Sequence, residues 1–129
     1  LLGKGIAERG WGLVFGGGGS GLMGAVANAA LKYKGHVTGI IPQGLTTEEP
    51  VINNLTELHI VKTMRERKEM MDNLSDAFVI IPGGIGTLEE LFEVWTARQV
   101  GFHDKPIILV NWNGYYEKLL QFIHESLNH

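Results

Sequence analysis

The sequence predicts an α/β protein with a doubly wound, Rossmann-like parallel sheet and helices on both of its faces. Short apolar runs alternate with longer helical patterns along the whole chain, which is typical of strands joined by helices. The apolar runs are almost continuous, as expected for strands buried on both faces of a parallel sheet. Two glycine-rich turns each follow an apolar run and open into a helical stretch, at the sheet edge where such folds bind ligands.

Length and composition predict a single domain over residues 1–129. The net charge is −3, with acidic and basic residues mixed along the chain, so we expect no nucleic-acid partner and no charged membrane surface. The chain has no cysteine, which excludes disulfides and is compatible with a reducing cytoplasm. No apolar run approaches the roughly 18 residues that a membrane span needs, and no signal peptide opens the chain. We therefore expect a soluble, cytoplasmic protein.

The first half of the chain predicts three helices and three strands. They are a helix ending at Gly10, strand 11–15, helix 22–34, strand 36–41, loop 43–54, strand 57–61 and helix 63–74. Gly3 and Gly5 weaken the prediction of the first helix, because glycine is a poor helix former. The second helix is apolar nearly all round, so we expect it to be buried on more than one side. The polar loop is expected to cover the edge of the site.

The second half predicts strand 77–81, a helix from Thr87 to about Val100, strand 106–110 and helix 114–127. Thr87 and Glu90 fit a capping box, with Thr87 as the N-cap and Glu90 at the third helical position. The helix that follows Thr87 has an apolar stripe that we expect to pack on the sheet. This stripe consists of Leu88, Leu91, Phe92 and Trp95.

The run from Ile80 to Glu90 reads as a strand, a glycine-rich turn and a helix start. Glycines at 83, 84 and 86 lack a Cβ, so backbone N–H groups can approach an anion closely. The helix start adds unpaired N–H donors and the positive end of the helix dipole. This stretch predicts a binding site for a nucleotide phosphate.

The earlier glycine loop formally matches GxGxxG through Gly16, Gly18 and Gly21. A classical NAD site needs an acidic residue about 20 residues later, but residues 41–43 are Ile, Pro and Gln, which disfavours NAD. Two interpretations stay open. The loop either contacts a ligand, or its glycines only permit a tight turn and close helix packing. The presence of a second glycine loop favours contact with a ligand.

Helical spacing places Arg67 on one stripe with Met64, Met71 and Leu74, while Arg65, Glu66 and Glu69 face away. A buried arginine needs a partner, because an unpaired charge in a dry setting costs several kcal/mol. The candidate partners are Glu90 and a bound phosphate. A structural salt bridge, or a packed stem with its head in water, is the alternative. Lys68 lies at the edge of the stripe and could reach the same anion.

Other chemistries have weaker support. The five histidines show no ligand spacing, so we expect no metal site. Ser20 lacks the glycine two residues later that a nucleophile elbow needs, since Leu22 stands there. Trp112, Tyr115 and Tyr116 are interpreted as core or interface aromatics, with a pocket role as the alternative.

Three segments together carry a family resemblance: GGGGSGLMGAVA at 16–27, MRERK at 64–68 and PGGIGTLEE at 82–90. The chain resembles the LONELY GUY family of cytokinin-activating phosphoribohydrolases, often labelled lysine decarboxylase-like, over essentially its whole length. The resemblance implies a Rossmann-like homodimer that needs no cofactor. It also implies a first strand before residue 1 and a tail after residue 129. The implied reaction splits an (N6-modified) adenosine 5′-monophosphate into free base and ribose 5-phosphate.

By this resemblance, Arg67 and Glu90 are the catalytic pair. The implied substrate- and phosphate-binding residues are Gly17, Gly18, Gly19, Ser20, Met64, Lys68, Gly83, Gly84, Ile85, Gly86, Thr87, Leu88, Glu89 and Thr96. Arg65 stands where the family commonly has histidine, but its outward position makes a role unexpected. A carboxylate suits the reaction, because it can stabilise an oxocarbenium-like ribose or deprotonate the attacking water.

Two alternative activities follow from the same resemblance. Decarboxylation of lysine usually needs pyridoxal phosphate on a lysine, and no lysine here has the setting of such a site. A non-catalytic carrier of a nucleotide or pterin cofactor is the second alternative, because relatives of this fold bind such ligands without hydrolysing them. The presence of both Arg67 and Glu90 favours the enzyme.

Overall fold

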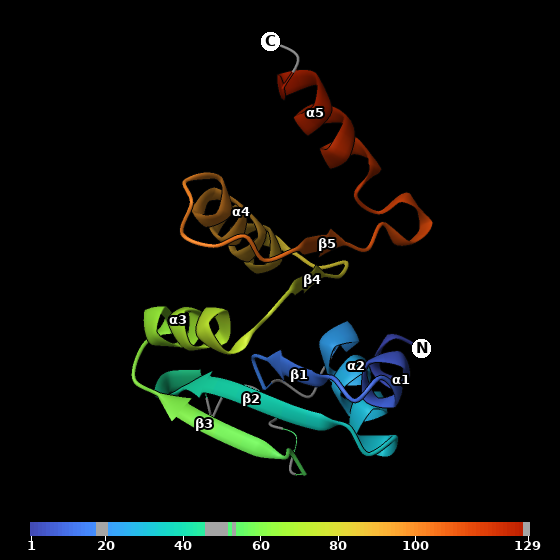
Figure 1. Cartoon of the computed structure of the whole chain (residues 1–129), viewed down its shortest axis with the longest axis vertical. Coiled ribbons are helices and arrows are strands. Elements are labelled where there is room, and N and C mark those ends of the chain that lie inside the picture. Colours follow the sequence, from blue (N-terminus) through green and yellow to red (C-terminus); the bar gives the residue numbers. More distant parts are fainter. Residues whose placement is uncertain (18–20, 46–51, 53, 128–129) are drawn as a thin grey trace. The chain divides into compact units, whose positions relative to one another are not determined.

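A computed structural model describes residues 1–17, 21–45, 52 and 54–127. It divides the chain into two compact units, Leu1–Ser75 and Asp76–His129, and each is described here by itself (Figure 1). Both units consist of parallel strands joined by helices, so the predicted α/β class with a parallel, Rossmann-like sheet is confirmed. The single domain over residues 1–129 stays a prediction.

The first unit contains a three-stranded parallel sheet in the order β1-β2-β3. Its elements are α1 (Leu2–Glu8), β1 (Gly12–Phe15), α2 (Gly21–Lys32), β2 (His36–Pro42), the short 3-10 turn η1 (Gln43–Leu45), β3 (Glu57–Val61) and α3 (Met64–Leu74). Each predicted helix and strand of this half is confirmed to within one or two residues. The predicted loop at 43–54 begins with η1, and most of its remainder lies outside the described residues.

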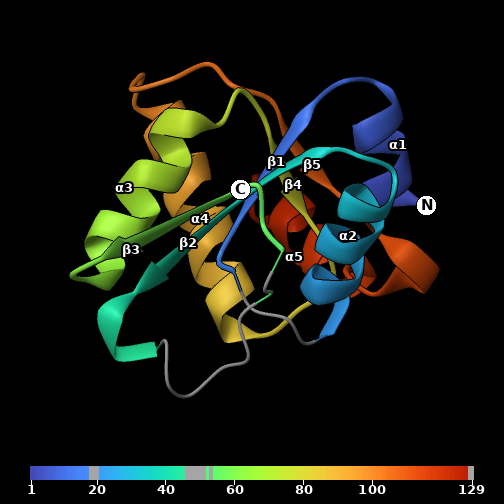
Figure 2. The same ribbon diagram turned by 90° about the horizontal axis from the view of Figure 1, so that it is seen from below.

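Strand β2 is the centre of this unit. Every residue from Val37 to Pro42 is buried, and because successive side chains of a strand point to opposite faces, both faces of β2 are covered. Val37 packs with Phe15 of β1 and with the alanines of α2. Helix α3 also packs on the sheet. Figure 2 shows α2 on one side of β2 and α3 on the other. This is the two-sided cover that the apolar strand predicts.

Helix α1 packs closely against α2 through small residues. A Cβ on the buried Gly3 would clash with the carbonyl oxygen of Val26 and lie 2.9 Å from the Cβ of Ala29. A Cβ on Gly35, just after α2, would lie 2.9 Å from the Cβ of Ala7. Gly3 therefore brings two helix backbones together, which explains a glycine inside α1. Helix α2 contacts both α1 and the sheet, so its predicted burial on two sides is confirmed.

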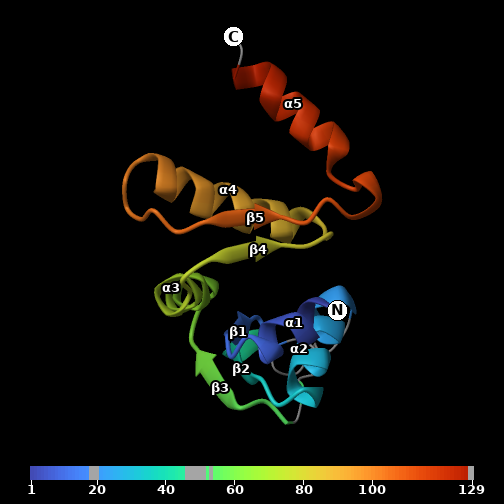
Figure 3. The ribbon, with the colours of Figure 1, turned by 45° about the vertical axis from the view of Figure 1, so that its right-hand side comes forward.

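The second unit is a βαβ arrangement followed by a helix (Figure 3). Its elements are β4 (Phe78–Ile80), α4 (Ile85–Gln99), β5 (Ile107–Leu109), the 3-10 turn η2 (Trp112–Gly114) and α5 (Glu117–Leu127). Strands β4 and β5 pair in parallel, with Val79 opposite Ile108. The core contains Ile80, Leu91 and Tyr116, with Leu88, Ile107, Leu109 and Leu119 packed around them.

The predicted capping box at Thr87 and Glu90 is wrong. Helix α4 begins at Ile85 with Gly84 as its N-cap, so Thr87 is the third helical residue and no side chain caps the helix. A capping box is instead found at α3, where Thr63 Oγ1 accepts a hydrogen bond from Glu66 N at 3.1 Å. The Glu66 carboxylate accepts one from Lys62 N at 2.8 Å. The glycines let α4 start three residues earlier than Thr87 as an N-cap would predict.

The apolar stripe predicted for α4 is partly wrong. Leu91 is buried and Leu88 half-buried as expected, but Phe92 and Trp95 are 42% and 36% exposed. Val94, three residues after Leu91, is buried in their place. The core therefore follows the spacing 88, 91 and 94, because β4 and β5 cover only a narrow face of the helix. Phe92 and Trp95 stack on each other at 6.3 Å beside that face.

None of the helices within the described ranges is long and apolar enough to cross a membrane.

Candidate functional site

The start of α4 supplies free hydrogen-bond donors. The N-cap Gly84 has no side chain that could accept a hydrogen bond from the first turn, and the first turn contains no acidic residue. The first N–H groups of any α-helix have no partner within the helix, and the aligned peptide dipoles make this end positive. The N–H groups of Ile85, Gly86 and Thr87 are therefore suited to binding an anion, as the sequence predicts.

The presence of glycine has two different explanations in this loop. A Cβ on Gly83 would clash with Thr87 Oγ1, so packing within the loop already requires glycine there. A Cβ on Gly84 or Gly86 would meet nothing within 4 Å in the described part of the chain. Packing within the unit does not explain these two glycines. Space for a bound group beside the helix start does explain them.

Glu90 lies on the same face of α4 as Gly86 and Thr87, because residues three and four apart are neighbours on a helix. Helical side chains lean towards the N-terminus, so the Glu90 side chain extends over the position of Gly86. Glu90 is half-buried. Glu90 therefore lies about one helical turn from the N–H groups at the start of α4.

The other predicted residues of α4 differ in placement. Leu88 packs in the core and its N–H donates to Gly84 O at 3.2 Å, so it has a structural role. Ile85 and Glu89 are exposed. Thr96 is exposed and, at 1.5 Å per residue, lies about 15 Å along the axis from Gly86, far from the helix start.

Two tyrosines that follow η2 bind the glycine loop. Tyr116 Oη donates to Ile81 O at 2.6 Å, and Tyr115 Oη donates to Gly83 O at 2.7 Å. Burial, and then the neighbouring Tyr115, raise the pKa of Tyr116 above its ordinary value, against a smaller opposing effect of the Gly83 backbone. The sequence alone does not indicate a contact of these residues with the loop. No local spacing could reveal it, because more than 30 residues separate the partners.

In the first unit, Arg67 lies against the end of β1. A Cβ on Gly16 would lie 3.1 Å from Arg67 Nη1, so the missing side chain makes room for the guanidinium. Arg67 Nε is buried and has no hydrogen-bond partner among the described residues. An orphaned donor on a cation marks a place where an acceptor such as a carboxylate or phosphate is expected. Met71 of the predicted stripe is half-buried like Arg67, whereas Met64 and Leu74 are exposed within this unit.

The first glycine loop is described only at its beginning. Gly17 has a φ of +83°, and a Cβ there would lie 2.5 Å from Ile41 Cγ1, so the turn itself requires glycine. Gly18, Gly19 and Ser20, predicted to bind substrate, lie outside the described residues. Lys68 is half-buried beside Arg67 on α3, and Arg65 is exposed as expected. Arg67 and Glu90 belong to different units, and their pairing stays a prediction.

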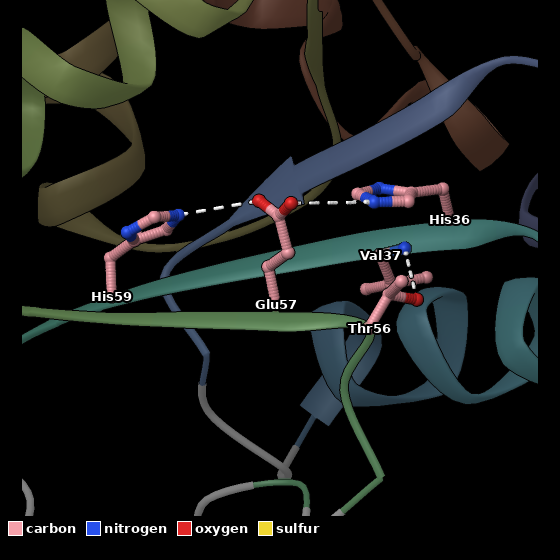
Figure 4. A network of polar contacts seen from close by, with 5 residues as sticks. All are labelled: His36, Val37, Thr56, Glu57 and His59. Atoms are coloured by element: carbon pink, nitrogen blue, oxygen red, sulfur yellow. Dashed lines mark hydrogen bonds and ion pairs between the residues drawn. The ribbon is translucent and has the colours of Figure 1, made fainter.

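A second polar cluster lies on the sheet of the first unit (Figure 4). Glu57 lies between His36, at 3.8 Å, and His59, at 3.3 Å, and all three side chains are exposed. Exposed ion pairs of this kind contribute little to stability. In the ranges that the structure describes, no group of three or more histidine and carboxylate side chains could hold a metal ion.

Comparison with known proteins identifies the family of this chain. The model described as "Possible lysine decarboxylase" matches residues 23–129. A cytokinin riboside 5'-monophosphate phosphoribohydrolase of Rhodococcoides fascians is 48% identical over 97% of this chain and 64% of its own length. Proteins of the same name from Mycobacterium tuberculosis and, with the suffix LOG, from Oryza sativa subsp. japonica are 45% and 48% identical. Each match covers 98% of this chain, and the matched parts make up 68% of the Mycobacterium tuberculosis protein and 52% of the Oryza sativa protein. The chain thus spans about half to two thirds of these relatives.

Two solved structures share the fold. The molybdenum cofactor binding protein of Rippkaea orientalis is 28% identical, with a TM-score of 0.72 over 95% of this chain and 70% of its own. The molybdenum cofactor carrier protein of Chlamydomonas reinhardtii has a TM-score of 0.73 over 98% of this chain and 72% of its own. At 23% identity, the second likeness concerns the fold alone.

Proposed function

We propose a function from the premise that this chain belongs to the family of cytokinin riboside 5'-monophosphate phosphoribohydrolases, whose family model is described as "Possible lysine decarboxylase". The protein hydrolyses the N-glycosidic bond of an adenosine 5'-monophosphate, with or without an N6 substituent. Water adds to C1' of the ribose as the bond to the base breaks, and the base leaves with a proton. The products are the free base and ribose 5-phosphate.

One observation carries this proposal: α4 combines an uncapped start, open glycines and a carboxylate on a single face. The N–H groups after Gly84 bind the 5'-phosphate, and the binding energy of this remote group positions the ribose for reaction. Glu90, which leans over Gly86, then stabilises positive charge on the ribose or deprotonates the attacking water. No cofactor takes part in these steps.

In this proposal, Arg67 completes the site as the partner of Glu90 or of the substrate phosphate. The support is its orphaned Nε and the room that Gly16 leaves for its guanidinium. The positive charge of Arg67 attracts the Glu90 carboxylate and orients it. The proposal also assigns Lys68, Met64, Gly18, Gly19 and Ser20 to substrate binding, as the family resemblance implies. A single domain that joins both units belongs to this proposal.

The test uses the full chain with AMP and isopentenyl-AMP, and follows free base and ribose 5-phosphate by chromatography. We expect both products from the unaltered protein. Glu90→Gln should reduce turnover by at least about a hundredfold, the usual effect of removing a general base, while binding of AMP is retained. Glu93→Gln, an exposed carboxylate one turn later on α4, is the matched control and should keep the original rate. A Glu90→Gln rate near that of the control would contradict the assigned role.

A carrier function is the second candidate, and the observation that favours it is the likeness to the Rippkaea orientalis molybdenum cofactor binding protein. A carrier binds a nucleotide or pterin-type ligand through the same helix start without breaking it. Stable binding of AMP with no release of ribose 5-phosphate would favour this candidate over the hydrolase. Release of ribose 5-phosphate that stops in Glu90→Gln would exclude it.

We further propose that the protein acts as a homodimer in the cytoplasm. The exposed, stacked pair of Phe92 and Trp95 on α4 supports an apolar contact between two copies of the chain. Light scattering at micromolar concentration should give twice the mass of the chain. A monomer at that concentration would contradict the proposal.

A further inference from the structure

The segment that follows β5 holds the glycine loop by its carbonyl groups. Val110 N donates to Ile80 O at 2.8 Å. Tyr116 Oη donates to Ile81 O at 2.6 Å, and Tyr115 Oη donates to Gly83 O at 2.7 Å. Three carbonyls within four residues are therefore bound by one neighbouring segment.

The two tyrosine bonds differ in what they orient. A peptide unit is planar and trans, so its C=O and N–H point in opposite directions. The Gly83 carbonyl shares its peptide with the N–H of Gly84, and the bond from Tyr115 therefore sets the direction of that N–H. The Ile81 carbonyl shares its peptide with Pro82, which has no N–H. Tyr116 thus holds the loop without directing a donor.

The Gly84 N–H is free to bind a ligand. It has no acceptor among the residues that the structure describes, and it adjoins the unpaired N–H groups of Ile85 and Gly86. A hydrogen bond to the carbonyl of a peptide also polarises that peptide and strengthens its N–H as a donor. Tyr115 therefore acts on both the direction and the strength of this donor.

Tyr115 is held in place but contributes little to the core. Its ring lies edge-on to Tyr116, at 4.9 Å and 89°. Tyr116 N donates to Asn111 Oδ1 at 2.7 Å, and Asn111 Nδ2 donates to Glu117 Oε2 at 2.9 Å, which braces the turn. Tyr115 is 56% exposed, whereas Tyr116 is 3% exposed. A role limited to stability would therefore give Tyr116 the larger effect on every property.

We propose that Tyr115 is a positioning residue for the phosphate group of the substrate, because its hydroxyl fixes the Gly83 carbonyl and so aims the Gly84 N–H at that phosphate. The inference rests on the proposed function, since it takes the ligand to be a nucleoside 5'-monophosphate. Tyr116 stabilises the same loop and has no such effect on phosphate binding.

The experiment compares Tyr115→Phe, Tyr116→Phe and Tyr33→Phe in the full chain. Each variant removes one phenolic hydroxyl. Tyr33 is the control, because it is an exposed residue of the first unit whose recorded contacts are made by its ring, with Lys4 and Lys32. Calorimetry gives the Kd of ribose 5-phosphate. Kinetics give kcat and KM for isopentenyl-AMP and kcat/KM for the same nucleoside without its phosphate. Urea unfolding gives stability.

We expect Tyr115→Phe to weaken ribose 5-phosphate binding about fivefold, the usual effect of one lost hydrogen bond. Its KM for the monophosphate should rise, while kcat/KM for the unphosphorylated nucleoside stays unchanged. Tyr116→Phe should lower the urea midpoint and change the Kd by less than about twofold. Tyr33→Phe should resemble the unaltered protein in all three measurements.

Three results would overturn the inference. They are an unchanged Kd in Tyr115→Phe, an equal loss in Tyr115→Phe and Tyr116→Phe, and an equal loss on the nucleoside that lacks phosphate. Binding of ribose 5-phosphate without cleavage of any monophosphate would overturn the proposed hydrolysis alone, because the Kd comparison would still decide the role of Tyr115. An unaltered protein that does not bind ribose 5-phosphate would overturn both.

Discussion

Replacing Gly16 by alanine perturbs Arg67 without changing it. The new Cβ would lie 3.1 Å from Arg67 Nη1 and 3.6 Å from Cζ, tighter than an ordinary contact, so the guanidinium must move by a few tenths of an ångström. Misplacement of a catalytic group by about 1 Å can lower a rate about a hundredfold, so a shift of this size should cost about tenfold in kcat/KM. Gly16 has no positive φ, so alanine adds no backbone strain there.

The matched control is Gly12→Ala, at the start of β1, the strand that ends one residue before Gly16. A Cβ on Gly12 would lie 3.7 Å from His36 O, an ordinary contact, and should leave the rate unchanged. Both variants are assayed with isopentenyl-AMP, and their urea midpoints are compared. Each should keep its stability to within about 1 kcal/mol, because alanine also restricts the unfolded chain. Equal rates for the two variants at equal stability would show that the position of Arg67 does not matter for catalysis.

Three further predictions concern stability, measured as thermal or urea midpoints. Gly3→Ala should destabilise the protein by about 1–3 kcal/mol, because the new Cβ meets the backbone of α2. Gly5→Ala should be neutral or stabilising, because its Cβ meets only the mobile end of an arginine side chain. A change in stability of the same sign for both variants would contradict the close helix contact. Thr63→Ala should cost about 1 kcal/mol through loss of the α3 cap. Thr56→Ala is not a neutral comparison, because Thr56 Oγ1 also accepts a backbone hydrogen bond, so Arg65→Ala on the exposed face of α3 is used instead. Because the pKa of Tyr116 is raised above 10.0, the contribution of Tyr116 to stability is present below pH 10 and is lost as the pH rises through the raised value. Tyr116→Phe should reduce this loss of stability at alkaline pH. An identical pH profile of stability in the variant would refute the raised pKa of Tyr116.

The alternation of strands and helices could be read from the chain alone, because each pattern is local. The run from Val37 to Ile41 is apolar except for Thr38, and it forms the buried central strand β2 of its unit. The glycine-rich turn after Ile80 leads directly into α4, as its composition predicts. Backbone freedom and side-chain periodicity act over a few residues, so they can be recognised without knowledge of the neighbours.

The start of α4 is a case in which the local pattern was misleading. Thr87 is a good capping residue, yet the helix begins at Ile85 with an uncapped Gly84 before it. The early start uses Thr87 to pack over Gly83 instead. Gly3 is a similar case, since a poor helix former is required inside α1 by the close approach of α2.

The sequence by itself determined the fold class and the family, because these depend on local periodicity and on residues that are adjacent in the chain. The same local composition led to the proposal that the PGGIGTLEE stretch binds phosphate. Only the tertiary structure decided what surrounds these residues. It brought Gly16 against Arg67 and the two tyrosines against the carbonyls of the loop, contacts between residues at least 30 positions apart. Such contacts depend on how helices and strands pack, and packing is a property of the folded chain that no local pattern records.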